Sequence, residues 1–202
     1  MPESTGDRPL GIFGGTFDPV HLGHLRLAEE ATDALGLAGI RWIPAGQPAL
    51  RDAPQAAAQQ RLAMVRLATA GNPRFTVDAG EVEAAQPSYT VQTLERLRRT
   101  DAYGPRRPLV LLVGADAFAG LPAWHRWQSL FDLAHIAIAH RPGFPIAVAD
   151  LPATLAAFWS ARFCDHPAPL AESPAGRIVT FAMTQLAISA TQIRALLASG
   201  AS

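Results

Sequence analysis

Short apolar runs alternate with segments of helical periodicity along this chain. The apolar runs predict β-strands, and apolar residues recurring at helical spacing predict α-helices. Strands alternating with helices imply right-handed βαβ units, and so an α/β fold built on a doubly wound parallel sheet. The strands are expected at 10–13, 40–43, 75–77, 109–113, 136–139 and 177–181, and the helices at 22–35, 56–69, 90–99, 123–133, 151–160 and 190–199.

Length and composition favour one domain with a sizeable core. The chain has 202 residues, of which 49% are hydrophobic, so enough apolar surface is available for one large α/β unit. No internal repeat divides the sequence. We therefore expect a single domain over residues 1–202, with the polar residues 1–9 flexible.

Charge and cysteine content limit the kinds of binding partner and the cellular compartment that we expect for the protein. Lys and Arg total 17 and Asp and Glu total 17, and this balance argues against binding to nucleic acid or to a membrane surface. Cys164 is the only cysteine, so no intrachain disulfide can form. Residues 1–9 lack the apolar core of a signal peptide, and the longest aliphatic run, 109–113, is too short to span a bilayer. A cytoplasmic protein is the expectation.

The segments that follow the predicted strands are the candidate binding loops. Doubly wound sheets bind ligands outside the carboxyl ends of their strands. Residues 14–24, 44–51, 114–116 and 140–141 follow four of the strands and are expected to share that edge.

The first of these loops has the features of a phosphate site. Gly14 and Gly15 let backbone N–H groups approach a phosphate closely, and Thr16 adds a hydroxyl donor. The loop then enters a helix, whose amino end attracts anions. His21 and His24 are three residues apart, so both imidazoles are expected on one face of the first turn, where they would stabilise developing negative charge.

Two other interpretations of this loop compete with the phosphate site. The histidines of an isolated His-x-x-His pair often only pack or cap a helix. Asp18, His21 and His24 would also suit zinc, although no further ligand stands at a recognisable spacing and Cys164 is alone. The full eleven-residue string, 14–24, is more specific than the histidine pair.

The last predicted helix opens with a second set of polar residues. Ser189 and Gln192 fit a capping box, which by itself is a structural feature. Thr191 and Arg194 add a hydroxyl and a guanidinium to the same helix start. Such a helix start would also hold the outer phosphates of a nucleoside triphosphate.

Together the two ends resemble the nucleotidyltransferase superfamily of the His-x-Gly-His type. The residues that carry this resemblance are Val20-His21-Leu22-Gly23-His24 and Ile188-Ser189-Ala190-Thr191-Gln192-Ile193-Arg194. Within that superfamily the chain resembles bacterial nicotinate-mononucleotide adenylyltransferases, through residues 14–21, 87–94, 114–116, 123–127 and 139–143. The likeness extends from about residue 10 to residue 197, and it implies a Rossmann-like fold.

The resemblance implies an activity and a set of site residues. The enzyme would transfer AMP from ATP to nicotinate mononucleotide in NAD biosynthesis, giving nicotinate adenine dinucleotide and pyrophosphate. Mg²⁺ would arrive with ATP, since the sequence shows no carboxylate cluster of its own for a metal, and a homo-oligomer is left open. The implied catalytic residues are His21, His24 and Arg194; the ATP-binding residues are Gly14, Gly15, Thr16, Gly114, Asp116, Ser189 and Thr191; and the mononucleotide-binding residues are Thr90, Trp124, His125 and Arg141.

Some of these residues have plainer interpretations. Trp124 and Trp127, three apart on a predicted helix, would suit an ordinary apolar core. Asp116 would suit a helix cap, and Arg141, which precedes a proline, would suit a solvated loop. At the level of the whole chain, the alternatives are pantetheine-phosphate adenylyltransferase, a non-catalytic nucleotide sensor and a metal-dependent hydrolase.

Three departures from the family pattern bear on the site. Leu50 stands where the family usually has a histidine, so of that loop's end only Arg51 is expected to keep a polar role. Ala190 replaces the commoner second serine and removes one hydroxyl. The sequence stops at Ser202, where many family members continue with another helix. We therefore expect that the surface covered by that helix in other members is covered by a different segment here or is left exposed.

Overall fold

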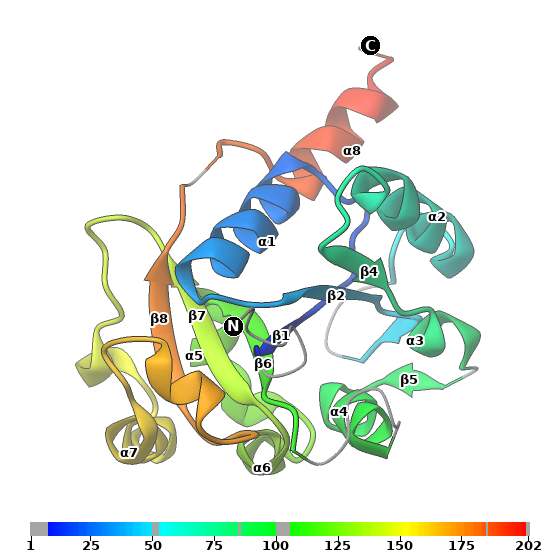
Figure 1. Cartoon of the computed structure of the whole chain (residues 1–202). Helices are drawn as coiled ribbons and strands as arrows, with labels where there is room; N and C mark the ends of the chain where they lie inside the picture. The colour runs from blue at the N-terminus through cyan, green and yellow to red at the C-terminus, as the bar shows by residue number, and fades with distance from the viewer. Residues whose placement is uncertain (1–7, 50–52, 85, 100–105, 185, 201–202) are drawn as a thin grey trace.

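The computed structural model has a parallel sheet at its centre with helices on both sides (Figure 1). It describes residues 8–49, 53–84, 86–99, 106–184 and 186–200. The flexibility expected of residues 1–9 and the expectations for Leu50 and Arg51 fall largely or wholly outside these ranges. None of the described helices is long and apolar enough to cross a membrane.

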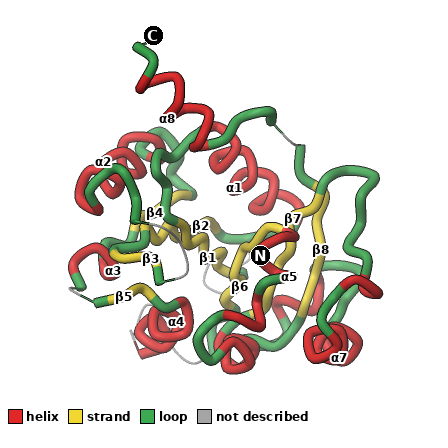
Figure 2. The backbone as a smooth tube through the Cα atoms, turned by 180° about the vertical axis from the view of Figure 1, so that it is seen from behind, coloured by secondary structure: helices red, strands yellow, loops and turns green. Residues whose placement is uncertain are grey.

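Within the described residues, six parallel strands form the main sheet in the order β4-β2-β1-β6-β7-β8 (Figure 2). The chain builds outward from β1 in one direction and from β6 in the other, which makes the sheet doubly wound as predicted. The strands are β1 Leu10–Gly15, β2 Gly39–Pro44, β4 Phe75–Val77, β6 Leu109–Gly114, β7 His135–His140 and β8 Ile178–Ala182.

The helices cover the two faces of this sheet. They are α1 Leu22–Ala34, α2 Ala58–Thr69, α3 Gly80–Glu83, α4 Thr90–Arg99, α5 Ala115–Ala119, α6 Leu130–Leu133, α7 Ala153–Arg162 and α8 Ala190–Ala198, with 3₁₀ turns η1 Leu121–Ala123, η2 Trp127–Ser129, η3 Val148–Asp150 and η4 Ala168–Ala171. The α8 helix lies beside the start of α1 and extends away from the sheet (Figure 1).

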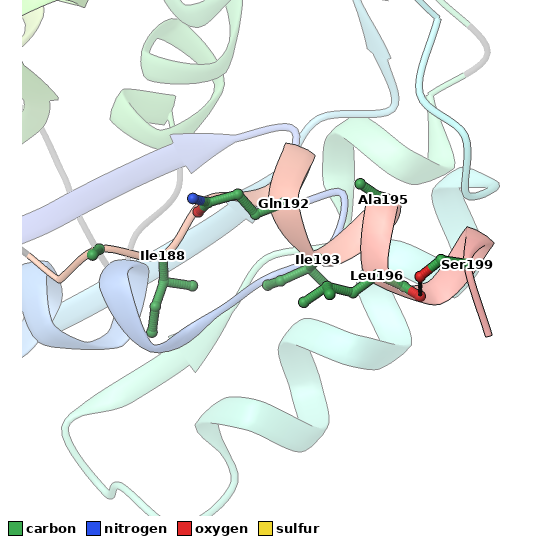
Figure 3. A pocket seen from close by; sticks show the side chains of 7 residues that line it. Ile188, Gln192, Ile193, Ala195, Leu196 and Ser199 are labelled. Atoms are coloured by element: carbon green, nitrogen blue, oxygen red, sulfur yellow. Dashed lines mark hydrogen bonds between the residues drawn. The ribbon is translucent and has the colours of Figure 1, made fainter. Parts of the chain in front are cut away.

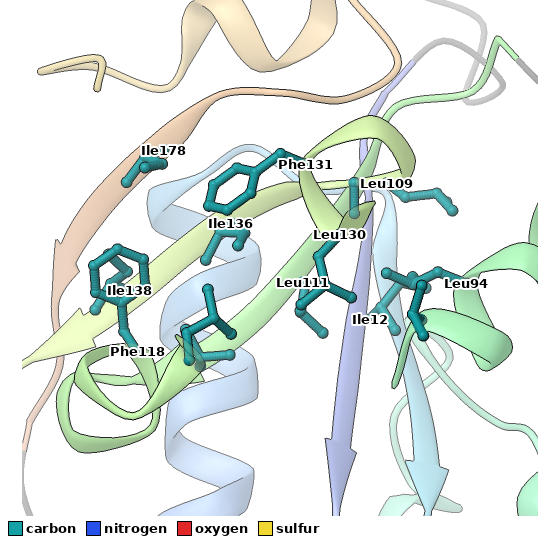
Figure 4. Close-up of a cluster of buried hydrophobic side chains, with 14 of the residues drawn as sticks. Ile12, Leu94, Leu109, Leu111, Phe118, Leu130, Phe131, Ile136, Ile138 and Ile178 are labelled. Atoms are coloured by element: carbon teal, nitrogen blue, oxygen red, sulfur yellow. The ribbon is translucent and has the colours of Figure 1, made fainter. Parts of the chain in front are cut away.

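Alternate residues of the central strands supply the two halves of the core. On β6, Leu109, Leu111 and Val113 pack on the face covered by α4, α5, α6 and α7 (Figure 4). Val110 and Leu112 pack on the face covered by α1 and α2. Successive side chains of a strand point to opposite faces, so a strand buried on both sides is apolar throughout, as the sequence of β6 is.

The single helix predicted over 123–133 is wrong. Trp124 is extended (φ −78°, ψ 143°) and Arg126 is left-handed (φ 51°, ψ 41°), so the segment divides into η1, a turn, η2 and α6. Both Trp124 and Trp127 pack against the core face that α4 covers, and Arg126 forms an ion pair with Glu95 at 2.9 Å. These tertiary contacts override the helical spacing of the apolar residues.

The remaining predicted elements are present with ends shifted by one or two residues. The helix predicted at 151–160 spans Ala153–Arg162, and the strand predicted at 177–181 spans Ile178–Ala182. The structure adds α3, α5 and a two-stranded sheet in which β3 (Gln47–Pro48) pairs with β5 (Pro87–Ser88). Elements of two to five residues are too short to show a periodic pattern, which explains why sequence analysis missed them.

Candidate active site

The candidate site lies where the sheet reverses its strand order, between β1 and β6. Gly14 and Gly15 end β1, and Gly114 ends β6, on the same edge. The carboxyl ends of adjacent strands at such a reversal leave a crevice in which ligands of doubly wound folds bind. The predicted loops 14–24 and 114–116 therefore belong to one edge of the molecule.

The histidine pair is assembled at the start of α1. His21 is the N-cap, with extended backbone (φ −148°, ψ 171°), and the two imidazole centroids lie 3.8 Å apart. The backbone N–H of His21 donates to Nδ1 of His24 at 3.2 Å. Because Nδ1 of His24 accepts this bond, the neutral ring carries its hydrogen on Nε2.

Gly23 makes room for this arrangement. A Cβ added at Gly23 would lie 3.0 Å from both Cε1 and Nδ1 of His21, which is tighter than ordinary contact. The glycine between the two histidines therefore lets the ring of His21 fold back over the helix start. This gives a steric reason for the His-x-Gly-His spacing.

Two aromatic rings lie next to the imidazole of His24. The ring of Phe17 meets that of His24 nearly at right angles, at 5.1 Å and 82°, and Phe13 lies 6.1 Å away. Phe17 has a positive φ of 48°, unusual for a bulky residue. A Cβ at Gly15 would come within 2.9 Å of the Phe17 ring, so the glycine that ends β1 accommodates this packing.

The imidazole of His21 is partly buried. Its Nδ1 atom is buried, and among the described residues it has no hydrogen-bond partner. Burial lowers the pKa of His21 below its ordinary value, so the imidazole is neutral near pH 7. A neutral imidazole can still donate one hydrogen bond to an anion.

The start of α8 is joined directly to the first loop. Arg194 donates through Nη1 to the backbone oxygen of Asp18 at 2.6 Å, and through Nη2 to Oγ1 of Thr191 at 3.3 Å. The predicted capping box is present: the Gln192 N–H donates to Oγ of Ser189 at 3.2 Å, and the Ser189 N–H donates to Oε1 of Gln192 at 2.9 Å. The two polar helix starts therefore lie side by side.

Asp18 is committed to backbone groups. Its buried carboxylate accepts N–H bonds from Gln55 at 2.7 Å and from Ala56 at 3.1 Å. Within the described ranges, His, Cys, Asp and Glu do not gather in groups of three that could hold a metal ion. The carboxylate of Asp18 thus has a structural role in the loop before α2, which weakens the zinc interpretation of Asp18, His21 and His24.

The residues after β6 lie on the opposite side of the strand reversal. Gly114 is the N-cap of α5, and Asp116 stands in its first turn with an exposed side chain. Asp116 is thus not the N-cap residue of this helix. The plain capping interpretation is therefore wrong, and the carboxylate is exposed at the carboxyl edge of the sheet.

The predicted mononucleotide residues are brought together in part. Thr90 begins α4, and the ring of the preceding Tyr89 lies 4.8 Å from that of His125. Trp124 is half-buried against the core, next to His125 in the chain. Arg141 follows β7 and is exposed, and among the described residues it makes no hydrogen bond or ring contact with the other three. Tyr89 was missed by sequence analysis, although its place beside Thr90 in the string 87–94 was a signal.

A separate apolar groove runs along α8 (Figure 3). Its volume is about 620 Å³. None of the predicted site residues lines it, and its lining is largely apolar, with Gln192 and Ser199 as its polar side chains. Its lining residues are Ala187, Ile188, Gln192, Ile193, Ala195, Leu196 and Ser199.

Comparison with known proteins identifies the family to which the chain belongs. The sequence profile of the cytidylyltransferase-like family matches residues 12–196. A protein of Dechloromonas aromatica is 66% identical over 95% of this chain and 87% of its own length, and one of Pseudomonas putida (strain W619) is 48% identical over 100% and 90%. Both bear the name "Probable nicotinate-nucleotide adenylyltransferase".

Solved structures share the fold. Nicotinic acid mononucleotide adenylyltransferase of Plasmodium falciparum, in complex with NaAD, superposes with a TM-score of 0.67 at 14% identity, covering 94% of this chain and 84% of that one. A structure from Vibrio parahaemolyticus that bears the name "Putative Nicotinate-nucleotide Adenylyltransferase" gives a TM-score of 0.56 at 14% identity, covering 96% of this chain and 90% of that one. The chain therefore belongs to the cytidylyltransferase-like family, in its nicotinate-nucleotide adenylyltransferase branch.

Proposed function

We propose that the protein transfers the AMP group of ATP to nicotinate mononucleotide, producing nicotinate adenine dinucleotide and pyrophosphate. One observation carries this proposal: the contact between Arg194 and Asp18, which brings the start of α8 against the loop that bears His21 and His24. Two helix starts, one with imidazoles and one with a guanidinium, then face a single polyphosphate.

ATP is expected to lie along the edge between β1 and α8. The backbone N–H groups at Gly14 and Gly15, with the Thr16 hydroxyl, would contact its phosphates, and Asp116 with the backbone at Gly114 would hold the ribose hydroxyls. The two histidines would lie near the α- and β-phosphates. The outer phosphates would be held by Ser189, Thr191 and Arg194.

The transfer needs no nucleophile from the protein. A phosphate oxygen of the mononucleotide attacks the α-phosphorus of ATP in line, forming the new P–O bond as the bond to the β-phosphate oxygen breaks and pyrophosphate leaves. Such reactions depend on positioning and charge stabilisation. Nε2–H of His24 is suited to donating to the α-phosphate oxygen, and Arg194 to stabilising the leaving pyrophosphate.

A divalent cation is expected to enter as part of the substrate. Asp18, the carboxylate nearest the histidines in the loop, already accepts two backbone N–H bonds, so the oxygens for the ion would come from ATP itself. We propose Mg²⁺ as that ion. It would neutralise phosphate charge.

The acceptor is expected to bind on the α4 side of the crevice. The indole of Trp124 would stack on the pyridine ring, and Thr90 with the backbone N–H at His125 would hold the ring carboxylate. Arg141 would contact the mononucleotide from the end of β7. Nicotinate mononucleotide should therefore give a higher kcat/KM than nicotinamide mononucleotide, and equal values would refute this assignment.

The direct test is a product assay. The protein is incubated with ATP, Mg²⁺ and one acceptor at a time: nicotinate mononucleotide, nicotinamide mononucleotide or pantetheine phosphate. Chromatography should show nicotinate adenine dinucleotide and stoichiometric pyrophosphate in the first reaction. Product only with pantetheine phosphate, or no product with any acceptor while ATP still binds, would overturn the proposal.

We also propose that the enzyme works in the cytoplasm, on small molecules alone. Balanced charge and a single cysteine support a cytoplasmic enzyme without nucleic-acid or membrane partners. Fractionation of expressing cells should place the protein with the supernatant rather than the membranes. Light scattering on the same preparation would decide whether it forms a homo-oligomer.

A further inference from the structure

Arg61 is a buried arginine whose guanidinium binds backbone carbonyls rather than a carboxylate. It lies in the first turn of α2, with 1% of its surface exposed. Burial lowers the pKa of its guanidinium, with Asp18 opposing that effect. Its acceptors are the backbone oxygens of Thr16 at 2.6 Å, Ala45 at 2.7 Å, Gly46 at 2.9 Å and Ala56 at 3.2 Å.

These four carbonyls come from three separate segments of the carboxyl edge. Thr16 belongs to the loop proposed to bind phosphate, Ala45 and Gly46 follow β2, and Ala56 precedes α2. No backbone ladder joins Thr16 to Ala56, which stand 40 positions apart, so the guanidinium makes that connection itself.

Asp18 completes the connection at the same residue, Ala56, through the peptide group that precedes it. Its carboxylate accepts the N–H of Ala56, while Arg61 donates to the oxygen of Ala56. The backbone oxygen of Asp18 accepts from Arg194 on α8. A continuous set of hydrogen bonds therefore runs from Arg61 through Ala56 and Asp18 to Arg194.

An arginine suits this role better than a lysine does. A guanidinium has five N–H donors in a fixed plane, whereas an ammonium has three on one atom. Only the guanidinium can span carbonyls that arrive from different directions. A lysine would leave some of these buried oxygens without a donor.

We propose that Arg61 is a positioning residue for adenylyl transfer. By holding the carbonyl of Thr16 it sets the loop before the histidine pair, and by holding Ala45 and Gly46 it sets the neighbouring loop after β2. It acts through these loops, and this inference rests on the proposed function. Its loss should impair ATP binding and turnover more than binding of the acceptor.

Arg98 provides a matched control at the opposite edge of the sheet. Its half-buried guanidinium also donates to backbone carbonyls, those of Leu133 at 2.9 Å, Arg107 at 2.6 Å and Pro174 at 2.8 Å. These residues precede β7, β6 and β8, at the amino ends of the strands. Replacing Arg98 removes a similar set of bonds without touching the candidate site.

The experiment compares Arg61→Lys with Arg98→Lys. Both variants should lower Tm, because both leave buried carbonyls unpaired. Only Arg61→Lys should lower kcat/KM for ATP, by roughly 10- to 100-fold on the scale of a misplaced reactive geometry. Its KM for nicotinate mononucleotide should change far less, and titration with a non-hydrolysable ATP analogue should show weaker binding.

Wild-type kcat/KM for ATP in Arg61→Lys, or an equal loss in Arg98→Lys, would overturn the inference. If the lysine variants do not fold, Arg61→Met and Arg98→Met carry the same comparison, since methionine keeps an apolar stem without burying an ammonium. If the wild type forms no dinucleotide, the proposed function fails. In that case the analogue titration alone decides whether Arg61 positions a triphosphate site.

Discussion

His24 is oriented before any substrate binds. Its Nδ1 accepts the backbone N–H of His21, and the rings of Phe13 and Phe17 lie behind it. A donor held in this way loses little freedom when it meets a phosphate oxygen, and preorganised donors contribute most where charge develops in the transition state.

Replacing His24 by Ala should lower kcat by roughly 10²-fold or more, the scale for losing one transition-state donor. The measurement is steady-state turnover with saturating ATP and nicotinate mononucleotide. His166→Ala is the control, because His166 is an exposed histidine that, among the described residues, forms an ion pair only with the neighbouring Asp165. Near-normal kcat in His24→Ala would remove His24 from the mechanism.

Gly23→Ala should separate activity from stability. Alanine in a helix is favoured over glycine by roughly 0.5–1 kcal/mol, but its Cβ would press on the ring of His21 from 3.0 Å. We expect kcat to fall while Tm changes little. Gly71→Ala is the control, because a Cβ there meets nothing within 4 Å. Unchanged kcat in Gly23→Ala would show that the position of the His21 ring does not matter.

At the scale of elements, α8 depends strongly on its cap. None of its residues is buried, so few packing contacts hold it, and its first turn is secured by the Ser189–Gln192 box and by Arg194 on Asp18. Short helices without a buried face are marginal in water. The orientation of Arg194 therefore relies on a few polar contacts at the start of the helix.

Ser189→Ala should destabilise α8 by about 1 kcal/mol, a usual cost of losing an N-cap side chain. Because Arg194 is carried by this helix, KM for ATP should rise as well. Ser199→Ala, at the other end of α8, should leave KM for ATP unchanged. Hydrogen exchange of the α8 amides and steady-state kinetics measure the two effects. An equal KM for ATP in both variants would contradict the role given to this helix start.

At the scale of the whole molecule, the amino edge of the sheet is held by buried polar side chains. His135, at the start of β7, is fully buried. Its Nε2 donates to the backbone oxygen of Ser173 at 2.8 Å, and its Nδ1 accepts the Arg177 N–H at 3.0 Å. Burial lowers the pKa of His135 to about 4, so the folded protein holds the neutral ring.

Because of His135, the free energy of unfolding should decrease as the pH is lowered. The folded-state pKa lies below the unfolded value of about 6.5, so protonation favours the unfolded chain. The stabilisation of the neutral ring is complete above pH 6.5 and is lost as pH falls towards 4, where the folded protein also becomes protonated. Between pH 7 and pH 4.5 the loss should be about 2–3 kcal/mol.

Denaturant unfolding of the wild type and of His135→Gln at both pH values measures this contribution. The carboxylates titrate alike in both proteins, so the difference between their free energies of unfolding isolates His135. That difference should shrink as pH falls. A difference that does not depend on pH would contradict the assignment.

Much of the fold and the placing of polar residues at two helix starts could be predicted because their causes are local. Apolar runs such as 109–113 indicate strands buried on both faces, and the spacing of His21 and His24 places both residues at one helix start. The Ser189 cap is likewise a property of four consecutive residues. The alternation of elements then places their loops on one edge.

The remaining features depend on residues distant in sequence, and only the tertiary structure decided them. Arg126 becomes left-handed because Trp124 and Trp127 share one core face, and Tyr89 meets His125 because α4 packs beside that turn. Arg61 reads as an ordinary polar residue of α2 until three loops bring their carbonyls around it. Local spacing sets the direction in which a side chain points from its own helix or strand. The hydrogen-bond partners of a buried polar group depend instead on which segments the packed core brings within reach.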